Sequence, residues 1–270
     1  MIRVGILGCG FIGSQICQAV CSGQINVELC GVFDVNPQKA SELAEKCGDR
    51  NLPKTTPSEV FEKADLVVEC ASQDAAKDVI LPALDHGCDV MVMSAGVFRD
   101  DDFYRAVREK AIQNKRKIYM PSGAVAGTDG IRSAAAAHVD SVTLTTRKPV
   151  AGLRDALYVT ENNICLDNIT EPLILFDGIA RDAVAAFPKN VNVCATLSLC
   201  GIGFDRTRVR IIADPSIHEN IHEVELVGDF GKMTMKIENK PSPQNPRTSY
   251  LAALSAIAML KRIADPFRIG

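Results

Sequence analysis

Short apolar runs alternate with helical periodicities along the first part of the chain. Runs of β-branched and aliphatic residues predict strands over 2–7, 27–33, 66–69, 90–93 and 117–120. Between these runs apolar residues recur at helical spacing, which predicts helices over 11–21, 38–46, 74–86 and 100–115. Strands that alternate with helices pair in parallel through right-handed crossovers. This part of the chain is therefore predicted to be a doubly wound α/β domain.

The pattern changes after Pro121. We expect a helix and a strand over 131–138 and 141–147, two alanine-rich helical stretches around 177–186 and 191–199, and strands over 207–213, 223–227 and 232–238. Residues 228–231 (Gly-Asp-Phe-Gly) predict a hairpin turn, and alternation in the strand after it is typical of a half-covered sheet. The second part is predicted to be an α+β domain.

A proline-rich segment precedes the end of the chain. Residues 241–246 read Pro-Ser-Pro-Gln-Asn-Pro, which predicts an extended linker because proline cannot occupy a helix interior or a central strand. Thr248 or Ser249 could then cap a final helix from Tyr250 to about Arg262. One face of that helix is apolar, and we expect it to return and pack on the first domain.

Composition and charge argue against nucleic-acid and membrane partners. The chain has 270 residues, of which 47% are hydrophobic and 23% charged, with a net charge of -3. No block of five like charges occurs, so no nucleic-acid partner is expected. No apolar run approaches the ~20 residues of a membrane helix, so no membrane partner is expected. The ten cysteines form no CxxC pair, and the chain begins directly with a strand pattern. We therefore expect a reducing, cytoplasmic location without a signal peptide.

A glycine motif stands between the first strand and the first helix. Residues 8–13 (Gly-Cys-Gly-Phe-Ile-Gly) fit GxGxxG, in which the glycines permit the tight turn and the approach of a pyrophosphate to the helix N-terminus. Asp34 follows Gly13 by 21 residues, at the end of the second strand, where a carboxylate binds the adenosine ribose hydroxyls. Since a carboxylate repels a 2′-phosphate, NAD is favoured, although NADP use stays open. The predicted cofactor contacts are Gly8, Gly10, Phe11, Ile12, Gly13 and Asp34.

The ends of two later strands add candidates. Ala71 and Ser72 follow the third strand, and residues 94–97 follow the fourth, at the edge where doubly wound sheets bind ligands. We expect Ala71 and Ser72 to contact the nicotinamide half of the cofactor. The fingerprint and the final helix divide the chain into a Rossmann dinucleotide-binding domain, residues 1–121 plus 246–270, and an α+β substrate-binding and dimerisation domain, residues 122–245.

Residues 218–222 (His-Glu-Asn-Ile-His) match the zinc motif HExxH. That chemistry requires both histidines on one face of a helix, whereas His222 runs into an alternating, strand-like segment. We therefore predict no metal site. His86 and His138 end predicted helices, where a structural role is favoured. His218 and His222 remain as candidate acid–base groups.

Several further segments resemble the archaeal and bacterial L-aspartate dehydrogenases, and the resemblance covers essentially the whole chain. They are residues 121–124 (Pro-Ser-Gly-Ala), 145–149 (Thr-Thr-Arg-Lys-Pro), 187–193 (Phe-Pro-Lys-Asn-Val-Asn-Val), 214–223 (Asp-Pro leading to Asn-Ile-His-Glu) and 241–249. The resemblance implies that His222 is catalytic and that Ala124 and Asn190 contact the cofactor. It also implies a homodimer and a role in supplying iminoaspartate for NAD biosynthesis. Residues 125–128 (Val-Ala-Gly-Thr) depart mildly from the family pattern.

The expected reaction removes a hydride from the Cα of L-aspartate and a proton from its amine, which leaves an imine that hydrolyses to oxaloacetate and ammonia. Histidine suits the proton transfer because its ordinary pKa lies near neutrality. A dicarboxylate requires cationic or polar anchors, for which the candidates are Arg147, Lys148, Asn192 and Thr196. Two alternatives stay open: another two-domain reductase, such as one acting on dihydrodipicolinate, and a non-catalytic NAD-sensing protein.

Overall fold

The structure is a computed structural model that describes residues 1–188, 192–242 and 248–267. The chain divides into two compact units. The first comprises Met1–Pro121 and Ala252–Gly270, and the second comprises Ser122–Leu251. No helix in the described ranges is long and apolar enough to cross a membrane.

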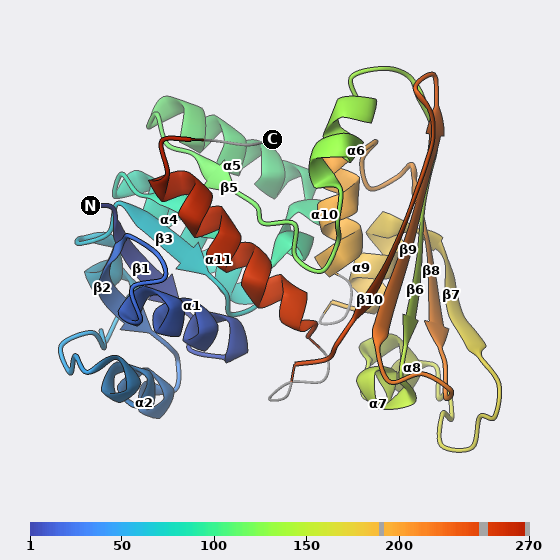
Figure 1. The fold of residues 1–270 in the computed structure, drawn as a ribbon, viewed down its shortest axis with the longest axis horizontal. Helices are drawn as coiled ribbons and strands as arrows, with labels where there is room; N and C mark the ends of the chain where they lie inside the picture. The colour runs from blue at the N-terminus through green and yellow to red at the C-terminus, as the bar shows by residue number, and fades with distance from the viewer. Residues whose placement is uncertain (189–191, 243–247, 268–270) are drawn as a thin grey trace. The chain divides into compact units, whose positions relative to one another are not determined.

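A five-stranded parallel sheet forms the centre of the first unit (Figure 1). Its strands stand in the order β2-β1-β3-β4-β5 and have the bounds β1 Arg3–Leu7, β2 Glu28–Phe33, β3 Leu66–Glu69, β4 Asp89–Val92 and β5 Ile118–Tyr119. The helices are α1 Phe11–Cys21, α2 Pro37–Cys47, α3 Pro57–Phe61, α4 Gln73–Asp85, α5 Asp101–Gln113 and α11 Tyr250–Ala264, with a 3-10 turn at Ala95–Arg99. The five predicted strands and the helices that correspond to α1, α2, α4 and α5 are confirmed in their order, whereas α3 and the 3-10 turn were not expected.

Both faces of this sheet are covered, which is why its strands read as continuous apolar runs. On one face, Val4 and Ile6 of β1 pack in a core with residues of α1, α2 and α11. On the other face, Gly5 lies so close to α3 that a Cβ added to it would stand 2.2 Å from the Val60 side chain. The apolar face of α11 contributes Ala256 and Leu260 to the first core, as the sequence predicts.

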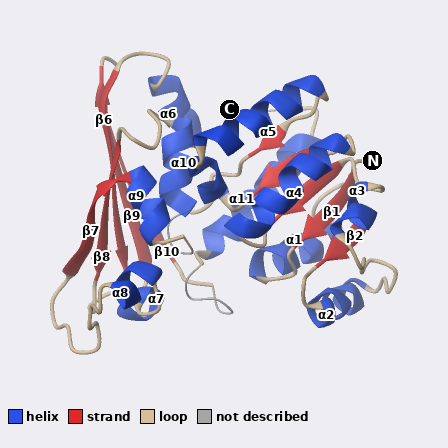
Figure 2. Ribbon diagram, turned by 180° about the vertical axis from the view of Figure 1, so that it is seen from behind, coloured by secondary structure: helices blue, strands red, loops and turns tan. Residues whose placement is uncertain are grey.

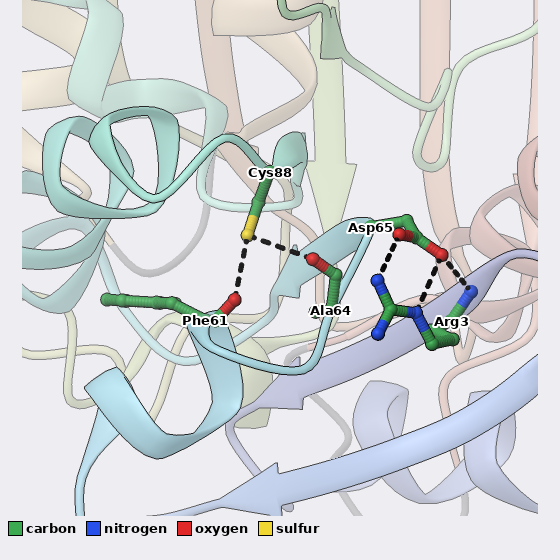
Figure 3. A network of polar contacts seen from close by, with 5 residues as sticks. All are labelled: Arg3, Phe61, Ala64, Asp65 and Cys88. Atoms are coloured by element: carbon green, nitrogen blue, oxygen red, sulfur yellow. Dashed lines mark hydrogen bonds and ion pairs between the residues drawn. The ribbon is translucent and has the colours of Figure 1, made fainter.

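Side-chain bonds tie the amino ends of the parallel strands together. Arg3 donates from its Nη2 to Asp65 Oδ1 at 2.6 Å, and its backbone N–H donates to Asp65 Oδ2 at 2.8 Å. The Cys88 thiol donates to the carbonyl oxygens of Phe61 and Ala64 at 3.3 and 3.2 Å (Figure 3). These contacts lie at the amino ends of the strands, whereas the glycine motif lies at the carboxyl ends. The carboxyl ends therefore stay accessible to a ligand.

The second unit has a mixed sheet with the order β10-β9-β6-β8-β7. Its elements are α6 Thr128–Ala134, β6 Val139–Lys148, α7 Val150–Leu153, α8 Leu157–Glu161, β7 Leu173–Ile179, α9 Ala180–Ala186, α10 Asn192–Cys200, β8 Thr207–Ala213, β9 Asn220–Gly228 and β10 Gly231–Asn239. Helices α6, α9 and α10 lie on one side of this sheet (Figure 2). The predicted hairpin is confirmed, because Gly228 pairs with Gly231 at the start of the β9–β10 ladder.

Three expectations for the second unit are corrected. Residues 177–179 belong to strand β7 and not to a helix, and helix α9 begins only at Ala180. The predicted helix over 131–138 is α6, which begins at Thr128 and ends at Ala134, and strand β6 begins at Val139 and not at Ser141. Strand β9 begins at Asn220 and not at Glu223, which places His222 inside the strand.

Candidate functional site

The glycine motif forms a tight turn after β1. Gly8 has a φ of +101°, and a Cβ on it would stand 2.8 Å from the backbone carbon of Cys70, the residue after β3. A Cβ on Gly13 would stand 2.1 Å from the carbonyl oxygen of Gly8, so only glycine permits this packing of α1 on the turn. A Cβ on Gly10 would meet nothing within 4 Å. The turn is therefore closed by its own backbone except at Gly10, where a phosphate can approach the start of α1.

The turn also stands at the topological switch point of the sheet. Strand β1 pairs with β2 on one side and with β3 on the other, and ligands of doubly wound sheets bind at the carboxyl ends of such strands. Phe11 and Ile12 open α1 here and are both half-buried. The residues present thus fit a dinucleotide cofactor.

Asp34 lies where β2 ends and joins the second strand to the glycine turn. Its Oδ2 accepts a hydrogen bond from the backbone N–H of Cys9 at 2.8 Å, and its Oδ1 accepts one from Asn36 at 2.8 Å. A carboxylate has about four acceptor positions, so both oxygens can still accept from hydroxyls. The structure thus brings together the acid and the glycines that the sequence singled out.

Glu69, at the end of β3, has a role that the sequence reasoning missed. Its side chain is fully buried and accepts bonds from Ala71 N at 2.8 Å, Ser94 N at 3.1 Å and Ser94 Oγ at 2.9 Å. Burial raises the pKa of the Glu69 carboxyl above its ordinary value, against the effect of these hydrogen bonds. Glu69 therefore links the loops that follow β3 and β4. The available signal was a charged residue inside an otherwise apolar strand.

The two cofactor candidates after β3 have different environments. Ala71 is exposed, and its backbone N–H donates to Glu69. The Ser72 side chain caps α4, because its Oγ accepts from the backbone N–H of Ala75 at 3.2 Å. Ser72 therefore has a helix-capping function, which the sequence reasoning did not identify.

In the second unit, buried polar side chains gather at one end of the sheet. Thr146 and Lys148 end β6, Asn220 and His222 begin β9, and Asn239 ends β10. All five side chains are buried. The register pairs Thr146 with His222 and Asn220 with Asn239, and directly paired residues present their side chains on the same face. Alternation along β6 places Lys148 on the same face as Thr146. This end of the sheet is a polar site inside an otherwise apolar layer.

His222 is held by Thr146. The Thr146 Oγ1 and His222 Nδ1 atoms are 3.1 Å apart, across the β6–β9 ladder. Burial, and to a smaller extent the nearby positive charge of Lys148, lower the pKa of His222 to about 3. The imidazole is therefore neutral near neutral pH, with a lone pair that can accept a proton. The ordinary pKa near neutrality that was expected from the sequence does not hold for this buried ring.

Lys148 and Arg147 are separated by the pleat of β6. The Lys148 side chain is buried, and burial lowers its pKa to about 8. Arg147, one residue earlier, is directed to the other face, where its Nη1 lies 3.6 Å from Oδ2 of buried Asp214. The structure therefore groups Lys148 with His222 and does not bring Arg147 to them.

Of the other sequence candidates in the second unit, Ala124 contacts the polar end of the sheet, whereas Asn192 and Thr196 lie on α10. Ala124 is buried, and its carbonyl oxygen accepts from Asn239 Nδ2 at 3.1 Å. Asn192 is exposed at the start of α10, and Thr196 is buried in the middle of that helix. Asn190 lies outside the described residues.

The histidine motif does not have the geometry of a zinc protease. His218 lies exposed in a bend before β9, while His222 lies buried within the strand. The helix on which the two ligands would share a face is therefore not formed. Among the described residues no group of three or more potential ligands is arranged to hold a metal ion. His86 caps α4, with its Nδ1 2.8 Å from the Pro82 carbonyl oxygen, and His138 Nε2 lies 3.2 Å from Asp140.

Models of known families match both units of the chain. Residues 129–263 match the family model described as aspartate dehydrogenase, C-terminal. Residues 8–121 match the model described as homoserine dehydrogenase, NAD binding domain. The first match includes His222 and Lys148, and the second includes the glycine motif, Asp34 and Glu69.

Similar proteins match along the whole chain. L-aspartate dehydrogenase of Methanosarcina mazei is 52% identical over 270 residues and that of Methanosarcina acetivorans 48% identical, each with all of both chains covered. The crystal structure of aspartate dehydrogenase from Thermotoga maritima superposes with a TM-score of 0.80 at 25% identity, again over the full length of both chains. Scyllo-inositol dehydrogenase from Lactobacillus casei shares the fold at 14% identity, with a TM-score of 0.62 over all of this chain and 91% of that one.

Proposed function

The chain belongs to the L-aspartate dehydrogenase family, and on that premise we propose how its residues carry out the NAD(P)-dependent oxidation of L-aspartate. The observation that carries the proposal is the buried pair of Lys148 and His222 on one face of the second sheet. Lys148 binds a carboxylate of the substrate, and His222 accepts the proton of the substrate amine. When bound, the oxidised nicotinamide accepts the hydride from Cα.

Thr146 prepares His222 for that step. If Nδ1–H donates to the Thr146 hydroxyl, the lone pair of Nε2 is left to accept the proton from the substrate nitrogen. The protonated ring can return a proton later, and the neutral ring can deprotonate the water that hydrolyses iminoaspartate to oxaloacetate and ammonia. Thr146 is thus a positioning residue, and His222 is the catalytic base.

Substrate binding would raise the basicity of His222. Burial and the charge of Lys148 lower the pKa of His222 to about 3. A dicarboxylate beside Lys148 brings negative charge into the site, which raises the pKa of both residues. His222 therefore becomes an effective base only when the anionic substrate is present.

We assign the dinucleotide to the glycine turn and to Asp34. Gly8 and Gly13 shape the turn, and Gly10 is the point where the pyrophosphate approaches the backbone. Asp34 accepts from the adenosine ribose hydroxyls, and its charge favours NAD over NADP. The remaining proposed contacts are Phe11, Ile12, Ala71, Ser72, Ala124 and Asn190 for the cofactor and Asn192 and Thr196 for the substrate. Arg147 is paired with Asp214 on the other face, which makes it a weaker substrate ligand than Lys148.

Three further proposals concern the setting of the reaction. The family resemblance supports a homodimer and the use of iminoaspartate in NAD biosynthesis. All ten cysteines are free thiols, which supports a reducing, cytoplasmic location. Dimerisation can be measured by light scattering of the purified chain.

An NADH absorbance assay across the common amino acids, run with NAD and with NADP, tests the function and the cofactor preference together. We expect turnover with L-aspartate and a higher kcat/KM with NAD. Turnover with another amino acid and none with aspartate would overturn the substrate assignment. Equal kcat/KM with both cofactors would overturn the role given to the charge of Asp34.

A further inference from the structure

We infer that the side-chain amide oxygen of Asn220 is the acceptor for the substrate nitrogen, and that it distinguishes amino and imino substrates from the corresponding keto acid. The inference rests on the proposed function, because it extends the site formed by His222 and Lys148. Asn220 is the first residue of β9, and its side chain is 1% exposed.

The amide of Asn220 is only half satisfied. Its Nδ2 donates to Ser249 Oγ at 3.5 Å, the far limit of a hydrogen bond. Its Oδ1 has no hydrogen-bond partner within the part of the chain that the structure describes. A buried acceptor without a donor is costly, so buried polar atoms are nearly always paired with protein, water or ligand. The free oxygen therefore requires a donor from water or from a ligand, and its position in the molecule decides between them.

The position of Asn220 identifies which ligand brings that donor. Asn220 and His222 are two residues apart on β9, so their side chains share a face. The antiparallel ladder between β6 and β9 ends with Arg147 opposite Ile221. The next residue of β6 is Lys148 and the next residue of β9 is Asn220, so these two residues are neighbours across the strands. The free oxygen thus lies in the same polar end of the sheet as the proposed base and the proposed carboxylate ligand.

Donor and acceptor chemistry then selects the substrate nitrogen. The two carboxylates of aspartate can only accept hydrogen bonds, so they suit the Lys148 ammonium and not an amide oxygen. The amine of aspartate and the N–H of iminoaspartate both donate. The keto oxygen of oxaloacetate only accepts, and it would face the Asn220 oxygen without a hydrogen between them. Asn220 is therefore expected to favour aspartate and iminoaspartate over oxaloacetate.

Asn220→Leu and Asn220→Ala, assayed as full-length enzyme with saturating NAD, test this inference. The two readouts are the KM for aspartate and the product-inhibition constant of oxaloacetate, measured without ammonium. We expect the KM to rise about tenfold, the loss of one buried hydrogen bond at ~1.4 kcal/mol, while oxaloacetate binds equally or more tightly. With NADH, oxaloacetate and ammonium, the ratio of malate to aspartate formed is expected to rise.

Ser198→Ala is the matched control. Ser198 Oγ is the other buried side-chain atom without a partner in the described residues, and it lies in α10 rather than among the polar residues at the end of the sheet. If unpaired burial alone mattered, Ser198→Ala would change the kinetics as Asn220→Ala does. We expect both constants to stay within about twofold of those of the unmodified enzyme. The second Asn220 variant keeps the test valid if one of the two fails to fold.

The outcomes separate this inference from the proposed site. If the aspartate KM and the oxaloacetate constant rise together, the amide presents its N–H to a carboxylate, and the inference is overturned. If neither moves while Lys148→Met raises both, only the role of Asn220 fails. If Lys148→Met changes neither constant, the proposed site itself is wrong.

Discussion

The two units use opposite means to build a site on a sheet. In the first unit the ligand-binding edge is made largely of backbone: a glycine turn, the N-terminus of α1, and loops joined by the buried Glu69. In the second unit the site is made of side chains that replace apolar residues at the end of a half-covered sheet. In the proposed function the first arrangement would bind a ligand by leaving room for it, whereas the second would bind by placing charge and proton acceptors in a low-dielectric environment.

The pKa values illustrate that difference. Lys148 and His222 are buried with lowered pKa values of about 8 and about 3. Both shifts disfavour the charged form, and an anion bound beside Lys148 would reverse them. At the dinucleotide turn burial also disfavours charge, since it raises the pKa of the Cys9 thiol to about 12. The donors that this turn offers to a ligand are backbone N–H groups, which carry no titratable charge. Chemistry is therefore expected to depend on the second unit, and cofactor affinity on the first.

The largest expected effect comes from removing the base. His222→Ala should lower kcat roughly 10²–10⁴-fold, the range for a positioned proton-transfer group, without changing the affinity for NAD. His218→Ala is the matched control, since His218 is exposed in a bend and should change kcat little. Steady-state kinetics with NAD titrations give both quantities. A fully active His222→Ala enzyme would contradict the division of roles between the units.

Removing the buried ammonium is expected to have the next largest effect. Lys148→Met should raise the KM for aspartate roughly tenfold to a hundredfold, since a hydrogen bond to a charged group contributes ~1.5–3 kcal/mol. Arg147→Met removes a cation one residue away, on the face where Arg147 pairs with Asp214, and should change the KM far less. Equal effects from the two variants would show that the strand pleat does not separate their functions.

Two glycine substitutions test the role of the backbone in the first unit. Gly10→Ala adds a methyl group that meets nothing within 4 Å, so the melting temperature should hold while NAD affinity falls about tenfold (~1.4 kcal/mol). Gly13→Ala puts a Cβ 2.1 Å from the Gly8 carbonyl oxygen, so it should lower the melting temperature itself. Calorimetry and thermal melts distinguish the two. Unchanged NAD binding in Gly10→Ala would mean that the pyrophosphate approaches elsewhere.

The smallest expected effect is on stability against pH. The folded pKa of Lys148, about 8, lies below its ordinary value of 10.5. Between these values the unfolded chain binds more protons, so this residue makes the free energy of unfolding rise with pH, by roughly 1 kcal/mol from pH 8 to 9. Buried thiols with raised pKa values act in the opposite direction, so the measurement is the difference between the unmodified protein and Lys148→Met in urea unfolding. A difference that is constant with pH would contradict the lowered pKa.

The fold was more predictable in the first unit than in the second. Buried parallel strands and amphipathic helices leave strong local patterns, and every strand of the first sheet was expected near its observed place. Strand β7 was missed because it lies at the sheet edge with most of its residues at least partly exposed, so its alternation is weak. Its last residues run directly into α9, which made the whole segment resemble one helix.

The candidate site residues also differ in how far they could be predicted from the sequence. The glycine motif and Asp34 were found from spacing, because a turn between a strand and a helix is a local structure. Glu69 was missed because its partners, Ala71 and Ser94, stand after two different strands. The role of Asn220 could not be predicted, because nothing in a sequence shows that the oxygen of a buried amide lacks a donor.

Local sequence patterns were sufficient to predict the strands of the first unit, the dinucleotide turn and the return of the last helix to the first core. Together with the family resemblance they predict His222, and not His218, as the acid–base group. The grouping of Lys148, and not Arg147, with His222 follows from the tertiary fold and could not be predicted from the sequence. The physical reason is register: Thr146 and His222 are 76 residues apart, and the pairing of β6 with β9 sets which side chains share a face. Burial on that face then sets the pKa values, because the desolvation of a charge depends on the whole surrounding fold.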